Sequence, residues 1–469
     1  MTDRPRMTYE DHLSDADTLM LALEDDATLR STILSTWVLD RTPDLARFER
    51  KLERALTIIP RLRQRIVADP LDLATPRWER DPNFDLRFHL RRTNLGGAGT
   101  VRDLLDHAEP IAMQAFDMDR PLWELHLIEG LEGGRCAALM KLHHAISDGV
   151  GLVKMTECLI ERGPEDENLP PLVDDEPEFT PPSDWDRIGE ALGRRLSTAR
   201  KNLGAVASTV ARQARDVVRD PIGRLREVGE TAASITRVLA PASEPMSPIM
   251  RERSTRVRFE YLAVSLEELK RAGKTHGGSV NDAFVAAVGG GLARYHEAHG
   301  QPVEALRMLM PVNVRGGDRA NEVGNQFSPA RFAVPVGIAD PGERIRAVRE
   351  ASREQRDEPA LPMIGPISAA LGRLPRPAVV ALFGAMQRTT DFTTSNVPGP
   401  RRPTWMSGAK VECVMPFGPL AGAALNVTVF SYDGTLHVGI NTDPAAIPDP
   451  ELLFECLQKS FDEILTLVA

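Results

Sequence analysis

Hydrophobic and polar positions along the first 160 residues alternate between a helical and an extended spacing. Apolar residues that recur every three or four positions predict amphipathic helices, whereas β-branched runs and polar–apolar alternation predict strands. The predicted helices cover residues 13–23, 43–59 and 101–116, and the predicted strands cover residues 31–39, 78–90, 121–129 and 135–142. A glycine-rich turn separates the last two strands and therefore predicts a β-hairpin. This hairpin leads into a polar turn that begins with two histidines.

The chain beyond residue 250 shows the same mixture of patterns. Strands are predicted over residues 254–264, 306–315, 331–336, 425–431 and 436–440, and helices over residues 266–270, 279–300 and 451–467. Ser265 and Ser279 precede two of these helices as capping residues, and Asp433-Gly434 marks a tight hairpin turn. Each half of the chain combines strands and helices in a similar proportion. The pattern therefore predicts an α/β fold of two lobes that face a shared cleft.

A change in composition separates the two halves. Residues 163–183 contain many prolines and acidic residues, which is typical of an extended, solvated linker. Residues 185–239 are rich in arginine and follow a helical pattern with sparse apolar positions. This segment fits a solvated crossover between the halves, and it also fits a basic amphipathic segment on a lipid surface. Since 469 residues are too many for one core, we predict an N-terminal lobe (1–162), a linker and crossover (163–250) and a C-terminal lobe (251–469).

The composition is typical of a globular enzyme inside the cell. Hydrophobic residues make up 42% of the chain, as in soluble enzymes, and 57 basic against 67 acidic residues give a net charge of −10. That charge argues against nucleic-acid binding, which needs a basic face. The four cysteines form no C-x-x-C pair, as expected in a reducing compartment. With no signal peptide and no apolar run near 18 residues, we expect a cytoplasmic protein that contacts the inner membrane or lipid bodies peripherally at most.

The polar turn after the hairpin contains the strongest candidate for chemistry. His143 and His144 follow a short apolar strand, and Asp148 and Gly149 precede apolar residues at helical spacing. Successive side chains on a strand point to opposite faces, so only one histidine can face a given cleft unless the strand has already ended. A histidine there can serve as a general base, and the carboxylate can fix the turn or orient an imidazole. A pair of structural histidines is the alternative interpretation.

Other catalytic arrangements are missing from the sequence. There is no G-x-S-x-G motif, and His296-Glu-Ala-His299 is one residue too short for H-E-x-x-H, so we predict no metal site. A base without a nucleophile fits direct attack of an alcohol or thiol on an acyl thioester, in which the imidazole takes the proton and returns it to the departing thiolate. The developing oxyanion needs a hydrogen-bond donor, for which Asn281 and Asn396 are candidates.

The segment His143-His-Ala-Ile-Ser-Asp-Gly149 matches the HHxxxDG motif of the acyl-CoA-dependent acyltransferases, which include chloramphenicol acetyltransferases and nonribosomal condensation domains. Further segments resemble motifs of one branch, the bacterial wax ester synthase/diacylglycerol acyltransferase family. They are Pro121-Leu-Trp123, Ser279-Val-Asn-Asp282, Gly324-Asn325, Ser395-Asn-Val-Pro-Gly-Pro400, and Leu425-Asn-Val together with Ser431-Tyr-Asp-Gly434. The resemblance runs from about Leu13 to the end of the chain, and motifs in this order and spacing are highly specific.

The resemblance implies an α/β fold with two chloramphenicol-acetyltransferase-like lobes and a substrate tunnel between them. It also implies roles for five residues. These are His144 as general base, His143 as the neighbour that places it, Asp148 as a mainly structural carboxylate, Gly149 as the residue that keeps the turn open, and Asn281 near the reacting carbonyl. The implied co-substrate is acyl-CoA, with no bound cofactor. The implied acceptor is diacylglycerol or a long-chain alcohol, so that the product is a triacylglycerol or a wax ester.

One segment departs from the family's pattern. Many members carry Pro-Met-His just before the first strand, where this chain has Thr28-Leu-Arg30. The departure predicts an altered acceptor fit. Two alternatives stay open, namely transfer to another lipid or polyketide-type hydroxyl, and a weakly active lipid-binding paralogue. The intact histidine motif argues against the second alternative, because binding alone needs no base.

Overall fold

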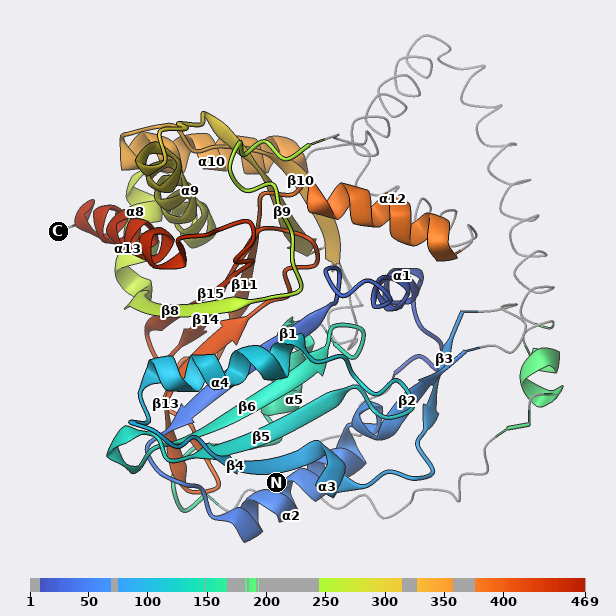
Figure 1. The fold of residues 1–469 in the computed structure, drawn as a ribbon. Helices are drawn as coiled ribbons and strands as arrows, with labels where there is room; N and C mark the ends of the chain where they lie inside the picture. Colours follow the sequence, from blue (N-terminus) through green and yellow to red (C-terminus); the bar gives the residue numbers. More distant parts are fainter. Residues whose placement is uncertain are drawn as a thin grey trace, which may run out of the picture.

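The structure is a computed structural model that describes residues 9–68, 75–147, 149–166, 182–183, 185–190, 193, 244–313, 327–356 and 376–468. These residues form two lobes, each built on one large β-sheet and covered by helices (Figure 1). The mixed α/β fold predicted from the pattern is confirmed. Most of the predicted linker at 163–183, most of the arginine-rich segment at 185–239 and the turn Gly324-Asn325 lie outside the described residues.

The N-terminal half contains the elements from α1 to β7. They are α1 (Asp15–Leu23), β1 (Thr32–Leu39), α2 (Leu45–Ile58), β2 (Gln64–Val67), β3 (Arg77–Arg80), α3 (Leu86–His89), β4 (Leu90–Asn94), α4 (Val101–Met113), β5 (Trp123–Glu129), β6 (Cys136–His143), α5 (Gly149–Thr156) and β7 (Ile160–Glu161). The predicted helices correspond to α1, α2 and α4. The predicted hairpin is the antiparallel pair of β5 and β6.

The strand predicted over residues 78–90 is wrong. The chain instead forms the short strand β3, the one-turn helix α3 and then β4. Asp85 caps α3, because its carboxylate accepts a hydrogen bond from a backbone N–H of that helix at 2.9 Å. His89 at the end of α3 is fully buried and stacks between Phe84 and Trp123, at ring-centre distances of 5.0 and 4.6 Å. This packing fixes the short helix, which polar–apolar alternation cannot distinguish from a strand.

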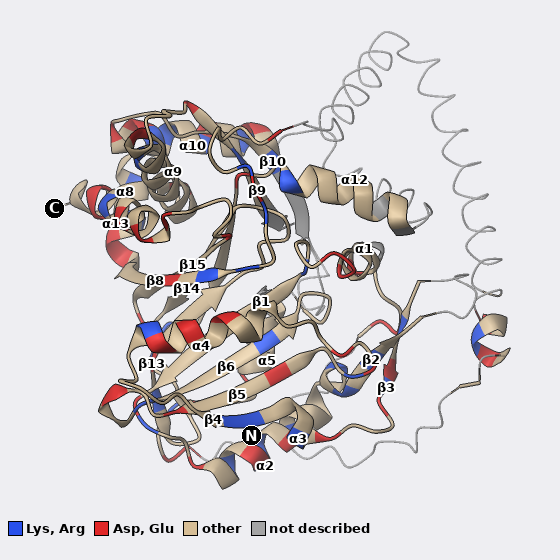
Figure 2. Cartoon of the chain, viewed as in Figure 1, with Lys and Arg blue, Asp and Glu red and all other residues tan. Residues whose placement is uncertain are grey.

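The C-terminal half contains the remaining elements. They are β8 (Arg258–Ser265), α8 (Leu266–Thr275), α9 (Val280–Ala298), β9 (Ala305–Asn313), β10 (Phe327–Pro335), α10 (Pro341–Arg356), α12 (Arg376–Arg388), β11 (Phe392–Pro398), β12 (Trp405–Met406), β13 (Ala409–Phe417), β14 (Leu425–Tyr432), β15 (Thr435–Thr442) and α13 (Pro450–Thr466). Apolar residues of α8, α9, α10 and α13 share one buried core with the strands of the C-terminal sheet. Figure 2 shows charged residues mainly on helices and connections, with the strands β1, β5 and β6 largely uncharged.

Strands from the C-terminal half complete the N-terminal sheet. That sheet has the order β4-β5-β6-β1-β13-β12-β7, and the second sheet has the order β10-β9-β11-β14-β15-β8. β13 is antiparallel to β1 and lies between it and β12. Where the two sheets meet, Gly439 of β15 allows a close crossing, because a side chain there would overlap the carbonyl oxygen of Pro416 in β13. The lobe boundaries predicted at residues 162 and 250 stay predictions.

Candidate active site

The histidine turn begins where strand β6 ends. β6 pairs with β1 up to His143, and the backbone N–H of His144 donates to the carbonyl of Ser31 at 2.9 Å. His144 is half-buried and is the first residue beyond the strand. Gly149 begins helix α5, while Asp148 lies outside the described residues. The strand has therefore ended between the two histidines, so the alternation of side chains along a strand does not force them to opposite faces.

His143 is completely buried, and each of its ring nitrogens has a polar neighbour. Nδ1 accepts a hydrogen bond from the backbone N–H of Ala145 at 3.1 Å, and Nε2 lies 3.1 Å from Oε1 of Glu24. The ring of Phe116 packs against this imidazole edge-on, with the ring centres 6.1 Å apart. An imidazole in this setting offers no lone pair to a substrate hydroxyl. These contacts favour a structural role for His143 and leave His144 as the candidate base.

Glu24 is a site residue that the sequence did not indicate. It is the C-cap residue of α1, and its Oε1 accepts a hydrogen bond from the backbone N–H of Ser31 at 2.6 Å. Burial alone would raise the pKa of this carboxyl. The contacts with His143 and Ser31, together with the nearby guanidinium of Arg30, outweigh burial and hold the pKa below its usual value of 4.5. A carboxylate therefore faces His143. No motif contains Glu24, so only the fold brings it to the site.

Lys141 places a buried cation on the same face of β6 as His143. The ammonium donates to the carbonyl of Gln114 at 2.8 Å and lies 4.4 Å from the ring centre of Phe116. Burial lowers the pKa of Lys141, and Glu124 at 3.9 Å opposes that shift. Because side chains two residues apart share one face of a strand, Lys141 and His143 pack against the same aromatic ring. These contacts fix the end of β6 below the turn.

The C-terminal lobe contributes two asparagines that contact each other. Asn281 lies in the first turn of α9, Asn396 lies on β11, and Nδ2 of Asn396 donates to Oδ1 of Asn281 at 3.4 Å. The helix start is fixed by Asp282, which accepts a hydrogen bond from the backbone N–H of Ser279 at 2.7 Å in a reciprocal capping box. The cap predicted at Ser279 is confirmed. The two alternative oxyanion donors of the sequence thus lie together.

Helix α5 brings the histidine turn to the junction with the C-terminal lobe. It follows the turn directly and contacts β11. Leu152 and Val153 of α5 pack in the same hydrophobic cluster as Val397, the residue after Asn396. The turn and the asparagine pair therefore approach the same junction from opposite lobes.

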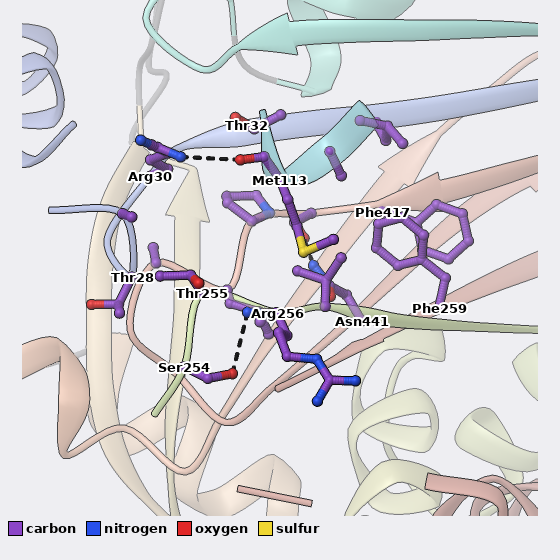
Figure 3. Close-up of a pocket in the computed structure, with 18 residues that line it drawn as sticks. Thr28, Arg30, Thr32, Met113, Ser254, Thr255, Arg256, Phe259, Phe417 and Asn441 are labelled. Atoms are coloured by element: carbon purple, nitrogen blue, oxygen red, sulfur yellow. Dashed lines mark hydrogen bonds between the residues drawn. The ribbon is translucent and has the colours of Figure 1, made fainter. Parts of the chain in front are cut away.

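A cavity of about 50 Å³ lies between the lobes at the start of β1 (Figure 3). Both lobes line it. The lining includes Thr28, Arg30 and Thr32 from the N-terminal half and Ser254, Phe259 and Asn441 from the C-terminal half. Figure 3 shows Arg30 at one end, where its Nη1 donates to the carbonyl of Met113 at 3.0 Å. The segment Thr28-Leu-Arg30, which departs from the family's pattern, thus forms part of the wall. The predicted tunnel stays a prediction.

The histidines at the end of α9 have partners other than a metal. His296 contacts the carbonyl oxygen of Leu292 through Nδ1 and the hydroxyl of Ser247 through Nε2, both at 2.7 Å. His299 contacts the carbonyl oxygen of Tyr295 at 2.8 Å. Within the described ranges, no group of three histidine, cysteine or acidic side chains is placed to hold a metal ion.

The fold defines the class of this protein as a two-lobed α/β protein with chloramphenicol-acetyltransferase-like lobes. The solved wax ester synthase/diacylglycerol acyltransferase from Marinobacter aquaeolei VT8 has a similar fold, with a TM-score of 0.63, 22% identity, and coverage of 97% of this chain and 98% of that chain. The first condensation domain of the calcium-dependent antibiotic synthetase gives a TM-score of 0.60 at 18% identity, with 98% and 97% coverage. The two-lobe fold predicted from the motifs is confirmed.

Sequence comparison identifies the family. The profile of the wax ester synthase/diacylglycerol acyltransferase catalytic domain matches residues 13–284, and that of the family's C-terminal domain matches residues 323–465. A Mycobacterium tuberculosis protein provisionally named diacylglycerol O-acyltransferase is 39% identical over 468 residues, covering 99% of this chain and 93% of that protein. Another from the same species is 32% identical over 467 residues, with 97% and 96% coverage. This chain belongs to the wax ester synthase/diacylglycerol acyltransferase family, as the motifs predicted.

Proposed function

We propose that this acyltransferase moves a long acyl chain from acyl-CoA to the hydroxyl of diacylglycerol or of a fatty alcohol, forming a triacylglycerol or a wax ester. The observation that carries the proposal is the histidine turn at the lobe junction, where His143 is buried against Ala145 and Glu24 and His144 lies just beyond the strand. The names of the relatives support these acceptors. Both Mycobacterium tuberculosis proteins are named for diacylglycerol, and the Marinobacter protein is named for wax esters and diacylglycerol.

In the proposed reaction, His144 acts as the general base. Its neutral imidazole takes the proton of the acceptor hydroxyl while the oxygen attacks the carbonyl carbon of the thioester. The tetrahedral intermediate then collapses, the carbon–sulfur bond breaks, and the imidazolium returns the proton to the thiolate of CoA. The products are the ester and free CoA, without an acyl-enzyme. The family resemblance gives Asp148 and Gly149 the role of supporting this turn.

Asn281 is the proposed donor to the oxyanion that develops in this reaction. Its Oδ1 accepts the hydrogen bond from Asn396, which fixes the amide plane. Its Nδ2 donates to the sulfur of Met310 at 3.6 Å, and a thioether sulfur is a weak hydrogen-bond acceptor. An oxyanion is a far stronger acceptor, so the amide can turn from the sulfur to the reacting carbonyl at little cost.

Purified protein is expected to convert radiolabelled palmitoyl-CoA and diacylglycerol, or palmitoyl-CoA and hexadecanol, into a labelled neutral lipid with release of free CoA. Thin-layer chromatography separates the two products, and a thiol reagent measures the CoA. Absence of product with both acceptors would contradict the proposal. Product with another lipid or polyketide-type alcohol would then favour the first alternative, and binding of acyl-CoA without turnover would favour the lipid-binding one.

Arg30 provides a test of which acceptor the cavity fits. Its Nε is buried and has no hydrogen-bond partner among the described residues. A diacylglycerol brings ester carbonyl oxygens that can accept this N–H, whereas a simple fatty alcohol brings none. We expect Arg30→Leu to lower kcat/KM for diacylglycerol about tenfold relative to kcat/KM for hexadecanol, because one buried hydrogen bond is lost in one case only. Steady-state kinetics with both acceptors measures this ratio.

Both acceptors are assayed on the same preparation of the Arg30 variant, so any loss of folded protein cancels in the ratio. Arg251→Gln is the matched control, since its side chain is 54% exposed and lies outside the cavity lining. The control should keep the wild-type ratio. An unchanged ratio in Arg30→Leu would mean that Arg30 does not contact the acceptor.

We also propose peripheral contact with a membrane or lipid droplet, while the predicted cytoplasmic location stays a prediction. Among the helices that the structure describes, none combines the length and the hydrophobicity that a membrane span requires. Trp185 exposes 81% of its surface, and tryptophan favours the membrane–water interface. The full chain should float with anionic liposomes, and Trp185→Ala should reduce the bound fraction. An equal bound fraction for both proteins would exclude contact through this residue.

A further inference from the structure

We infer that Glu24 is a positioning residue for the acyl transfer, because its carboxylate holds His143 in one tautomer and fixes the backbone that carries His144. This inference rests on the proposed function, since it assigns a role within that reaction. Three observations carry it, namely a backbone relay to His144, the polar contacts of the His143 ring, and the ionised state of the Glu24 carboxyl.

The backbone relay runs from Glu24 through Ser31 to the candidate base. Oε1 of Glu24 accepts the N–H of Ser31 at 2.6 Å, and the carbonyl of the same residue accepts the N–H of His144 at 2.9 Å. Both hydrogen bonds lie at the point where β1 begins and β6 has ended. The position of the His144 backbone is therefore tied, through one residue, to the end of α1.

The ring of His143 is restricted to one tautomer by its two neighbours. The N–H of Ala145 donates to Nδ1 at 3.1 Å, so this nitrogen carries no proton. The proton of the neutral imidazole is therefore on Nε2, which lies 3.1 Å from Oε1 of Glu24. The hydrogen bond at one ring nitrogen of a histidine sets the state of the other. Without the carboxylate, the buried Nε2–H would lose the negative charge that lies 3.1 Å away. The preference for a proton on Nε2 would then weaken, and in the other tautomer Nδ1 has no lone pair for the N–H of Ala145.

The charge of Glu24 strengthens both contacts. Burial by itself would raise the pKa of Glu24, but the contacts with His143 and Ser31 and the nearby Arg30 lower it, so the group is ionised at neutral pH. Hydrogen bonds to an ionised acceptor are shorter and stronger than those to a neutral one. Because Oε1 accepts from the N–H of Ser31 and lies 3.1 Å from Nε2 of His143, a single group contacts the side chain of one histidine and the backbone that holds the other. Glu24 thus acts on His144 only through its neighbours.

Glu24→Ala removes the shared acceptor and is expected to lower kcat about 10- to 100-fold, as for other groups that orient a functional histidine. The KM for acyl-CoA should change less than about twofold, because Glu24 contacts the turn and not the substrate. In ¹⁵N NMR spectra, the wild-type His143 ring should show protonated Nε2 and unprotonated Nδ1, and the variant should show both tautomers. Asp25→Asn is the matched control, since it removes the exposed neighbouring carboxylate, and it should keep the wild-type kcat and tautomer.

Glu24→Gln keeps an oxygen acceptor and removes the charge. This variant should keep the wild-type tautomer and lose kcat only about threefold, since a neutral acceptor forms a weaker hydrogen bond. If Glu24→Ala does not fold, the kcat of Glu24→Gln still tests the inference. A wild-type kcat in Glu24→Ala or Glu24→Gln, or an unchanged single tautomer in folded Glu24→Ala, would overturn the inference. Absence of acyl transfer by the wild-type protein would contradict the proposed function. The NMR measurement of the His143 tautomer needs no turnover, so it tests the role of Glu24 independently.

Discussion

A His144→Ala variant is expected to lose acyl transfer about 10²- to 10⁴-fold in kcat, which is the usual contribution of a general base. The substitution removes the only imidazole of the pair that can take a proton from the acceptor. His143 cannot replace it, because its Nδ1 accepts from Ala145, its Nε2 faces Glu24 and its ring is fully buried. The KM for acyl-CoA should change little, since the base acts on the acceptor hydroxyl. Initial rates with labelled palmitoyl-CoA measure both constants.

His107→Ala is the matched control for the His144 variant. His107 is a partly buried histidine on α4, and it should be replaced without loss of kcat. Added imidazole should restore part of the activity of His144→Ala, because a free base can enter the space left by the side chain. Turnover near the wild-type rate in His144→Ala would contradict the mechanism, even if the chain proved to be an acyltransferase.

Glu161→Ala is expected to lower the free energy of unfolding by about 3–5 kcal/mol, because it leaves a buried cation without its partner. Glu161 of β7 and Lys51 of α2 expose 1% and 2% of their side chains, and their charged atoms are 2.8 Å apart. Arg47 lies 2.9 Å from the same carboxylate, which also accepts the backbone N–H of Gly408 at 3.1 Å. Burial lowers the pKa of Lys51, and the carboxylate opposes that shift. Urea denaturation followed by circular dichroism measures the change.

Glu412→Ala is the control for the Glu161 variant, because this carboxylate is 42% exposed and lies 3.7 Å from Arg135. Its removal should change the free energy of unfolding by less than about 1 kcal/mol. The double variant Lys51→Met/Glu161→Leu should lose less stability than Glu161→Ala alone, since no lysine is then left buried without a partner. Equal losses in Glu161→Ala and Glu412→Ala would mean that the buried pair does not stabilise the fold.

Features that depend on neighbouring residues could be predicted from the sequence. The turn at Asp433-Gly434 requires two residues with positive φ, and the structure has φ values of 45° and 81° there. Ser279 and Asp282 identify the start of α9 because a capping box needs only residues three apart. The histidine motif could be located in the same way. Strand geometry left two cases open for the motif: either only one histidine faces the cleft, or the strand ends between the two. Strand β6 ends at His143, so the second case holds.

Features that depend on distant segments could not be predicted. Glu24 is the partly buried C-cap residue of the short helix α1, and nothing in its local sequence distinguishes it from the other acidic residues nearby. Its role arises when β1 and β6 pair and carry Ser31 and His143 to it. The insertion of β13 beside β1 is similar, because strand order follows from packing across the whole chain. Alternation misled at residues 78–90, where stacking of aromatic rings determines the local structure.

The late position of β13 in the chain has a consequence for synthesis on the ribosome. β1 lies between β6 and β13, so its second edge has no partner until residues 409–417 have been made and have left the exit tunnel. An unpaired strand edge is a site of aggregation, and nascent chains of this size are exposed to it for as long as translation continues. The nascent N-terminal sheet therefore keeps an unpaired edge until late in translation, and prematurely terminated chains lack the strand that would cover it.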